Sequence, residues 1–359
     1  MDMDLFQHPE FDHHEQIIFC NDRESGLKAI IAIHNTTRGP GVGGCRMRPY
    51  KNTEEALRDV LRLSRGMTYK SGINNLHFGG GKSVIIGDPK TQKTPALLQA
   101  MGRFVEKCSG GYIIAEDMNI GPKDLEIMAS QTQHVTGLEK MGSSGNPSPV
   151  TAHGVFSGLK SAVEHKLGRQ SLEGIKIAIQ GTGSVGAALA RELAAEGAIL
   201  FVADINEASA TSLATETGGT VVPLTEIYSQ DVDVFSPCAI GGILNTETID
   251  QLKATIIAGA ANNQLARPEH GQLLHDKGIL YAPDYVINAG GIINIHLEFY
   301  NKPYDRTKAM ETVEITGSVL TEVFDYSEKH DTPTHESADI IAETRFKPSK
   351  KSDVKEFAI

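Results

Sequence analysis

The chain has 359 residues, of which 40% are hydrophobic and 22% charged, which is ordinary globular usage. This length suits two domains better than one. The net charge of −11 argues against a nucleic-acid partner. Residues 1–15 are polar and acidic, unlike a signal peptide, and no apolar run approaches a membrane span. We therefore expect a cytoplasmic protein that binds neither nucleic acid nor membrane.

The four cysteines are scattered along the chain without C-x-x-C spacing, which is typical of reduced thiols. The 13 histidines show no spacing typical of metal ligands, so we expect no bound metal.

The first part of the chain alternates between apolar runs and glycine-rich stretches. Residues 27–34 read as a buried strand, and residues 38–46 as a glycine-rich loop. Thr53 is a candidate N-cap of the helix that follows, because acidic residues and apolar residues at helical spacing come directly after it. Lys70 is expected just past the end of that helix.

Three consecutive glycines, Gly79, Gly80 and Gly81, precede Lys82. Glycine admits positive φ angles and a close approach of the backbone to a ligand. Residues 83–86 read as the strand that follows. A lysine beside another cation, in a pocket that excludes water, can act as a base near neutral pH. Taken alone, the stretch could also be two surface lysines around a turn.

Asp117 comes two residues after a short predicted strand, residues 112–115. Active groups of α/β proteins gather at the carboxyl ends of strands. A carboxylate there can equally be a turn or cap residue. Asp117 is therefore a candidate functional residue only together with the lysines.

A dinucleotide-binding motif follows in the second half. Residues 175–180 read as a strand, Gly181, Gly183 and Gly186 give the G-x-G-x-x-G spacing, and a helix is expected after them. Asp204 ends the next predicted strand. This context makes the motif specific, since the glycines admit a pyrophosphate and the acid meets the ribose hydroxyls. Because Asp204 would repel a 2′-phosphate, the sequence favours NAD over NADP.

Alternating strands and helices continue to about residue 330, which predicts a parallel sheet. The small, polar residues 142–150, with two prolines, predict a hinge. The predicted fold class is α/β, with a substrate domain and a Rossmann-type, doubly wound NAD-binding domain separated by a cleft. The expected domains are residues 1–141 for substrate and oligomerisation, 142–330 for NAD, and 331–359 returning to the first domain.

Several separate motifs resemble the glutamate/leucine/phenylalanine/valine family of amino-acid dehydrogenases. They cover residues 42–47, 67–70, 79–82, 115–117, 142–151, 261–263 and 282–291.

The resemblance implies NAD-dependent oxidative deamination of branched-chain L-amino acids to 2-oxo acids and ammonia, with the reverse reductive amination, in a homo-oligomer. By resemblance Lys82 is the catalytic lysine, Asp117 relays protons at the amino group, and Lys70 holds the substrate carboxylate. The other implied substrate residues are Val42, Gly43, Gly44, Met67, Ala115, Thr136, Asn263, Ile292 and Ile295. The implied cofactor residues are Thr151, Gly181, Thr182, Gly183, Ser184, Val185, Gly186, Asp204 and Asn262.

The chain departs from the family pattern at the expected pocket, where Val42 stands in place of leucine and Ile292 and Ile295 in place of two valines. These departures leave the preference among leucine, valine and isoleucine open. Alternatives are a phenylalanine- or glutamate-specific member of the family, and a catalytically silent NAD-binding regulator. Glutamate would need a cation for its γ-carboxylate, which Val42 and Ala115 do not offer.

Overall fold

The computed structural model describes residues 4–138, 144–301 and 303–347. The chain divides into two compact units: unit 1 is Met1–Gly145 with Ile340–Ile359, and unit 2 is Asn146–Asp339. Residues 142 and 143 of the predicted hinge, and the tail from residue 348, lie outside the described residues. The roles assigned to the domains stay predictions.

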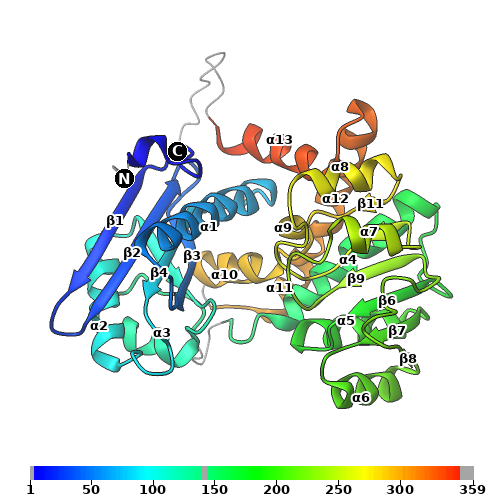
Figure 1. The fold of residues 1–359 in the computed structure, drawn as a ribbon, viewed down its shortest axis with the longest axis horizontal. Coiled ribbons are helices and arrows are strands. Elements are labelled where there is room, and N and C mark those ends of the chain that lie inside the picture. Colours follow the sequence, from blue (N-terminus) through cyan, green and yellow to red (C-terminus); the bar gives the residue numbers. More distant parts are fainter. Residues whose placement is uncertain (1–3, 139–143, 302, 348–359) are drawn as a thin grey trace. The chain divides into compact units, whose positions relative to one another are not determined.

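Unit 1 contains a five-stranded mixed sheet (Figure 1). Strand β2 runs antiparallel to β1 and β4, whereas β3 runs parallel to β4 and β5. In sheet order, the strands are β1 (Gln16–Asp22), β2 (Leu27–Asn35), β4 (Gly79–Ile86), β3 (Gly41–Arg48) and β5 (Tyr112–Ala115). The described helices whose residues fall in unit 1 are η1 (Leu5–Gln7), α1 (Thr53–Ile73), α2 (Pro95–Lys107) and α3 (Pro122–Ala129), with the end of α13 (Thr334–Phe346).

Helices cover both faces of this sheet because β2 is apolar on both sides. Ile31 and Ile33 belong to the core that includes α2 and α3. Ile30 and Ala32, which alternate with them, pack in the core formed with α1. The continuous apolar run read as a buried strand is confirmed, and its two-sided burial is the reason for it.

Three local predictions for unit 1 are wrong. The N-cap of α1 is Asn52, whose side chain accepts the Glu55 N–H at 2.8 Å, so Thr53 is the first helical residue. The helix runs to Ile73, so Lys70 lies in its last turn and not beyond it. The glycine-rich residues from Gly41 onward form strand β3 and not a loop.

Unit 2 contains a six-stranded, all-parallel sheet. In sheet order, the strands are β8 (Thr220–Val221), β7 (Ile199–Ala203), β6 (Lys176–Gln180), β9 (Val234–Pro237), β10 (Ile256–Ile257) and β11 (Leu280–Tyr281). The chain moves outward from β6 to one edge, and then from β9 to the other. This is the doubly wound Rossmann order, with its switch point between β6 and β9. The predicted fold class is confirmed in this respect.

The described helices of unit 2 number more than the sequence predicted. They are α4 (Ser148–Leu167), α5 (Ser184–Ala195), α6 (Glu207–Thr217), α7 (Thr246–Gln251), α8 (Glu269–Asp276), α9 (Asp284–Ile287), α10 (Gly290–Tyr300), α11 (Arg306–Val313) and α12 (Ile315–His330). The last two of these helices, α11 and α12, meet at Glu314. Helix α4 begins inside the stretch predicted as a hinge.

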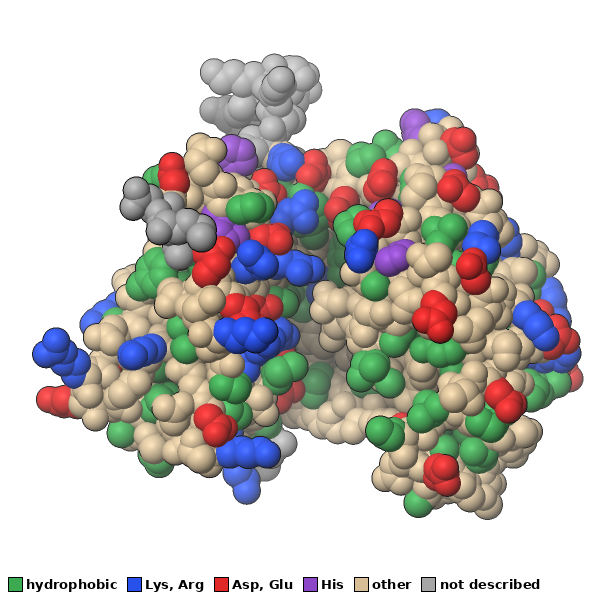
Figure 2. Space-filling model, in the orientation of Figure 1, with side chains coloured by type: hydrophobic (Ala, Val, Ile, Leu, Met, Phe, Trp, Pro, Cys, Tyr) green, Lys and Arg blue, Asp and Glu red, His purple; other side chains and the backbone are tan. Residues whose placement is uncertain are grey.

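None of the described helices is long and apolar enough to cross a membrane. On the face shown in Figure 2, acidic and basic side chains lie next to one another. The arrangement is that of an ordinary charged surface.

Candidate active site

Lys82 lies within strand β4, between β2 and β3 of the unit 1 sheet. Gly79, Gly80 and Gly81 belong to the same strand, and none of the three has a positive φ. The strand expected over residues 83–86 therefore begins earlier, at Gly79, and the positive φ angles that glycine allows are not used here. The neighbours of these three residues explain why they are glycines.

A methyl group at Gly80 would collide with the backbone and side chain of Thr68 in helix α1. At Gly81 it would lie 2.7 Å from the ring of Tyr112 on β5. The glycines thus let helix and strand approach closely. The same packing brings Met67 of α1 over β3, since its Cγ lies 3.3 Å from the position of a methyl group at Gly43. Met67 and Gly43 are both predicted substrate residues.

Lys82 and Asp117 form a close, largely buried ion pair. The Lys82 Nζ lies 2.7 Å from the Asp117 Oδ2, and the lysine side chain is 9% exposed. The same Oδ2 accepts from Arg46 Nε at 3.1 Å. Burial raises the pKa of Asp117, but the positive charges of Lys82 and Arg46 outweigh it and hold the pKa below its ordinary value. Asp117 is therefore an ionised acceptor in direct hydrogen-bond contact with Lys82.

A tight turn after β5 fixes the position of Asp117. Its backbone N–H donates to the Ile120 carbonyl at 3.2 Å, and the Ile120 N–H donates back at 2.9 Å. Gly44 on β3 lies directly below, where a methyl group would collide with the Glu116 carbonyl and come within 2.7 Å of the Asp117 Cβ. Gly44 is thus required by the approach of the turn that carries Asp117.

The last turn of α1, which carries Lys70, is held by the end of α13. The Arg345 guanidinium donates to the backbone carbonyl of Ile73, which is the last residue of α1. The Phe346 ring lies against Gly72, 2.9 Å from the position of a methyl group there. The Tyr69 hydroxyl donates to Glu343 at 2.6 Å. The sequence did not predict α13.

The remaining predicted unit 1 residues lie on or beside β3 and β5. Val42 and Ala115 are 1% and 4% exposed. Thr136 is 2% exposed, and its N–H donates to the Ile114 carbonyl at 3.0 Å. Val42 lies on β3 and Ala115 on β5, and β3 pairs with β4, the strand that carries Lys82.

In unit 2, each glycine of the motif has its own reason. Gly181 has a φ of +105°, which only glycine adopts readily. A methyl group at Gly186 would collide with the Gly181 carbonyl, so this glycine lets helix α5 start close to the turn. A methyl group at Gly183 would meet no atom within 4 Å. Gly183 and Ser184 are exposed at the start of α5, which has no side-chain cap. Backbone N–H groups at such a helix start bind phosphate.

Asp204 follows β7 and faces the glycine-rich turn. Its Oδ2 accepts the Thr182 N–H at 2.6 Å, and its Oδ1 accepts the Asn206 N–H at 2.8 Å. Burial raises the pKa of Asp204, but these hydrogen bonds outweigh it and keep the pKa below its ordinary value. A fixed negative charge therefore stands beside the turn.

The other predicted unit 2 residues lie on loops and helix starts. A methyl group at Gly290, the start of α10, would lie 2.5 Å from the Thr151 Cα, so α10 begins against α4. Asn262 accepts from Asn288 at 2.8 Å, and Asn263 has a positive φ of 52°. Val185 is half-buried in α5.

Ile292 is 4% exposed and Ile295 is half-buried, both on α10.

Comparisons with known proteins agree with this architecture. A family model described as "Glu/Leu/Phe/Val dehydrogenase, dimerisation domain" matches residues 14–134, and one described as "Glutamate/Leucine/Phenylalanine/Valine dehydrogenase" matches residues 200–352. The chain belongs to this family. The predicted membership is confirmed.

Relatives within the dehydrogenase family differ in the substrate that their names give. A leucine dehydrogenase of Geobacillus stearothermophilus is 49% identical over 98% of this chain and 95% of its own length. A phenylalanine dehydrogenase of Bacillus thermotolerans is 47% identical over 98% and 92%. The crystal structure of an L-tryptophan dehydrogenase from Nostoc punctiforme has a TM-score of 0.84 and 47% identity, covering 93% of this chain and 96% of that one. Identity alone therefore does not choose the substrate of this dehydrogenase.

Sequence reasoning gave no role to Arg46, although it was part of a quoted motif. Arg46 also pairs with Asp59 of α1 at 3.3 Å, and the Tyr50 hydroxyl donates to Asp59 at 2.7 Å. Arg46 is one of two arginines in β3, and the sequence alone does not distinguish it from Arg48. Two exposed apolar side chains were also missed: Ile205, directly after Asp204, is 90% exposed, and Ile240 in the loop after β9 is 69% exposed.

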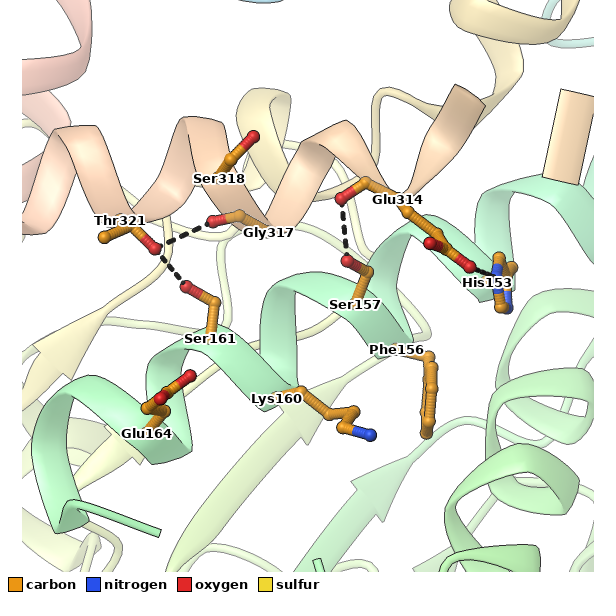
Figure 3. A pocket seen from close by; sticks show the side chains of 10 residues that line it. All are labelled: His153, Phe156, Ser157, Lys160, Ser161, Glu164, Glu314, Gly317, Ser318 and Thr321. Atoms are coloured by element: carbon orange, nitrogen blue, oxygen red, sulfur yellow. Dashed lines mark hydrogen bonds and ion pairs between the residues drawn. The ribbon is translucent and has the colours of Figure 1, made fainter. Parts of the chain in front are cut away.

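An open groove between α4 and α12 lies apart from the motif residues in unit 2 (Figure 3). His153 of α4 contacts Glu314 at 3.3 Å, and it also contacts Glu192 of α5 at 2.7 Å. The Ser157 hydroxyl donates to the Glu314 carbonyl at 2.9 Å. These contacts hold α4 to its neighbours. Among the described residues, no cluster of histidine, cysteine and carboxylate side chains could hold a metal ion.

Proposed function

We propose that this dehydrogenase catalyses the NAD-dependent oxidative deamination of branched-chain L-amino acids, and the reverse reductive amination. The observation that carries the proposal is the buried Lys82–Asp117 pair in a member of an amino-acid dehydrogenase family. Deamination requires groups that remove and return protons at water and at the amine. A lysine and a carboxylate 2.7 Å apart can pass a proton directly.

The residues of unit 2 fit a dinucleotide. The start of α5 is open, the Gly183 position leaves room for a ligand, and the fixed Asp204 carboxylate is available to ribose hydroxyls. The exposed Ile205 and Ile240 offer apolar surface for a planar ring. NAD supplies hydride acceptance when bound. The negative charge of Asp204 disfavours a 2′-phosphate, so NAD is preferred to NADP.

Each of the three polar residues in unit 1 has its own role. Lys70 holds the substrate α-carboxylate as a point charge. Lys82 takes a proton from the water that attacks the substrate carbon after hydride has left. Asp117 carries protons to and from the departing amine. Gly43, Gly44 and Met67 shape the floor on which the substrate lies, and Asn263 is assigned to substrate in the same scheme.

The pocket argument for substrate choice rests on apolar residues. Val42 and Ala115 are buried in unit 1, and neither offers a cation to a γ-carboxylate. Ile292 and Ile295 of unit 2, which the family resemblance assigns to substrate, are larger aliphatic side chains. An apolar pocket separates substrates that differ by one methylene by only about 1–3 kcal/mol, so leucine, valine and isoleucine should all react.

The test is the rise in absorbance at the NADH band when the protein is mixed with NAD and each amino acid at alkaline pH. We expect leucine, valine and isoleucine to give faster turnover than phenylalanine, tryptophan or glutamate. Faster turnover of an aromatic amino acid or of glutamate would overturn the pocket argument. No turnover of any amino acid, in a protein that binds NADH, would favour the silent regulator.

We also propose a homo-oligomer that assembles through unit 1. The family model over residues 14–134 is described as a dimerisation domain. Strand β1 lies at the edge of its sheet and exposes Phe19 at 54%. Light scattering of the purified protein would test this, with a monomer as the contrary result. A cytoplasmic location belongs to the same proposal, because all four cysteines are free thiols.

A further inference from the structure

Arg46 joins the catalytic pair to a second carboxylate. From strand β3, its Nε donates to Asp117 Oδ2 at 3.1 Å and its Nη1 lies 3.3 Å from Asp59 Oδ2. The Lys82 ammonium shares the same Asp117 oxygen. Arg46, Lys82 and Asp117 have side chains 16%, 9% and 22% exposed, so water screens their charges only in part.

The two cations in this cluster differ in one respect. An arginine stays protonated in proteins, whereas a lysine can lose its proton. When Lys82 gives up its proton during the reaction, Asp117 would be left as a buried carboxylate without a cation if Arg46 were absent. Such a charge is costly, and the carboxylate would retain the proton within the pair. With Arg46 in contact, Asp117 keeps a cationic partner throughout.

We propose that Arg46 is a positioning residue that holds Asp117 ionised and in place while Lys82 changes its protonation state. The inference rests on the proposed role of Lys82 as the base. Arg46 does not touch the reacting atoms and acts through Asp117.

The surroundings of Arg46 suit this role. Asp59, from helix α1, anchors the far end of the guanidinium, and the Tyr50 hydroxyl donates to Asp59 at 2.7 Å. Burial, with the neighbouring Asp59 charge, raises the pKa of Tyr50, so this hydroxyl remains a donor. Two neighbouring titratable groups, the Cys45 thiol and the Tyr112 hydroxyl, interact with Asp117, and burial raises the pKa of both, so they stay neutral. Further out, Arg48 pairs with Glu55 and Lys93 with Asp124. Lys82 is therefore the group whose charge change Arg46 compensates.

The test compares Arg46→Gln, which removes the charge but keeps an N–H donor, with Arg46→Lys, which keeps a charge. Arg48→Gln is the matched control, because Arg48 lies two residues further along β3 and also pairs with a carboxylate of α1. Two quantities are measured against pH in each folded protein: kcat/KM for leucine, and the rate at which an amine-reactive acylating reagent labels Lys82, by mass spectrometry of its peptide.

We expect two features to move about 1 pH unit upward in Arg46→Gln: the limb of kcat/KM that rises as Lys82 loses its proton, and the midpoint of Lys82 labelling. This is the size typical of losing one nearby opposite charge on the carboxylate. Arg46→Lys should restore most of the shift, and Arg48→Gln should show none. Unchanged midpoints in Arg46→Gln would overturn the proposal and leave Arg46 a purely structural link between β3 and α1. Arg46→Met gives a second neutral variant if Arg46→Gln fails to fold.

The labelling readout separates this inference from the proposed function. If the unmodified protein oxidises no amino acid but the labelling midpoint still moves in Arg46→Gln, the proposed function fails and the coupling stands. If the protein oxidises leucine and the midpoint does not move, the proposed function stands and the role of Arg46 fails.

Discussion

The two units place their functional groups by different means. In unit 1, the proposed chemistry depends on side-chain charges: ion pairs join Asp117, in the turn after β5, to Lys82 of β4 and Arg46 of β3. In unit 2, the groups proposed to face the cofactor are backbone N–H groups. Their position depends on the positive φ of Gly181 and on the close approach that Gly186 allows. Asp204 bonds to backbone amides and not to a cation.

Because of this difference, substitutions in the two units should have separable effects. A charge removed from unit 1 should affect the chemical step and its pH dependence, because the groups there are proposed to move protons. A change at the turn or at Asp204 in unit 2 should affect cofactor affinity. The following substitutions test whether the chemical step and cofactor affinity can be changed separately.

Lys82→Ala should lower kcat by about 10²–10⁴-fold, the usual range for a general acid–base group. The limb of the pH–rate profile in which the rate rises as Lys82 loses its proton should disappear with it. Steady-state rates with leucine between pH 7 and 11 would measure both. Near-normal kcat in this variant would mean that another group is the base.

Gly44→Ala should lower kcat by about 100-fold, because the added methyl group displaces the turn that carries Asp117 and a misplacement near 1 Å has that cost. The control is Gly66→Ala in helix α1, where a methyl group meets no atom within 4 Å. That control should retain full activity and stabilise the helix by about 0.5–1 kcal/mol. Equal activity in the two variants would contradict the packing account.

Lys70→Ala should raise KM for the amino acid by about 10-fold or more, since a hydrogen bond to a charged group contributes about 1.5–3 kcal/mol. Some loss of kcat from misalignment should accompany it. Initial rates over a wide range of leucine concentrations measure the two effects. A fall in kcat with KM unchanged would assign Lys70 to the chemistry instead of to binding.

Asp204→Ala should weaken NAD binding by about 10-fold through the loss of charge-assisted hydrogen bonds to ribose. The gap between NAD and NADP should narrow, because the repelling charge is gone. Rates with both cofactors at saturating leucine would show this. A preference for NADP in the unmodified protein would be the contrary finding.

The smallest effect concerns stability against pH. Burial lowers the pKa of His34 in unit 1 to about 4, so the unfolded chain takes up a proton at higher pH than the folded one. Neutral His34 therefore adds to the free energy of unfolding above its ordinary pKa near 6.5. This contribution, up to about 3 kcal/mol, is lost as pH falls toward 4. His34→Gln should remove this loss in urea unfolding at pH 7 and pH 5.

His153 in unit 2 should change the stability with pH in the opposite direction. Burial alone would lower its pKa, but Glu192 and Glu314 outweigh it and raise the pKa. Its contribution is therefore present at low pH and is lost as pH rises through the raised pKa. His153→Gln should make unfolding less, and not more, dependent on pH above 6.5. If the free energy of unfolding changes with pH by the same slope in His34→Gln and His153→Gln, the opposite pKa shifts of the two histidines are contradicted.

The sequence predicted unit 2 better than unit 1 because its motif is a backbone requirement. The positive φ of Gly181 and the close start of α5 demand glycine at fixed spacing, so the pattern is legible. Gly79, Gly80 and Gly81 were misread because they make room for α1 and Tyr112, which are contacts between distant parts of the chain. No local pattern distinguishes a glycine at a turn from a glycine under a helix.

The ion pair between Lys82 and Asp117 also depends on contacts that no local sequence pattern reveals. Lys82 and Asp117 were predicted as functional residues, but the link through Arg46 to Asp59 joins β3 to α1 and has no sequence signature. Strand β1 and helix α13 were missed for a related reason. Only Cys20 of β1 is buried, which gives a weak pattern. The contacts of α13 with Ile73 and Gly72 are formed by residues about 270 positions away.

The separation of chemistry from cofactor binding is tested most directly by an NADH titration of folded Lys82→Ala, followed by fluorescence. We expect a dissociation constant within about 2-fold of the unmodified protein, because the turn at Gly181–Gly186 and Asp204 are held by contacts within unit 2. Loss of NADH binding in this variant, with the protein folded, would contradict the assignment of Lys82 to the chemical step.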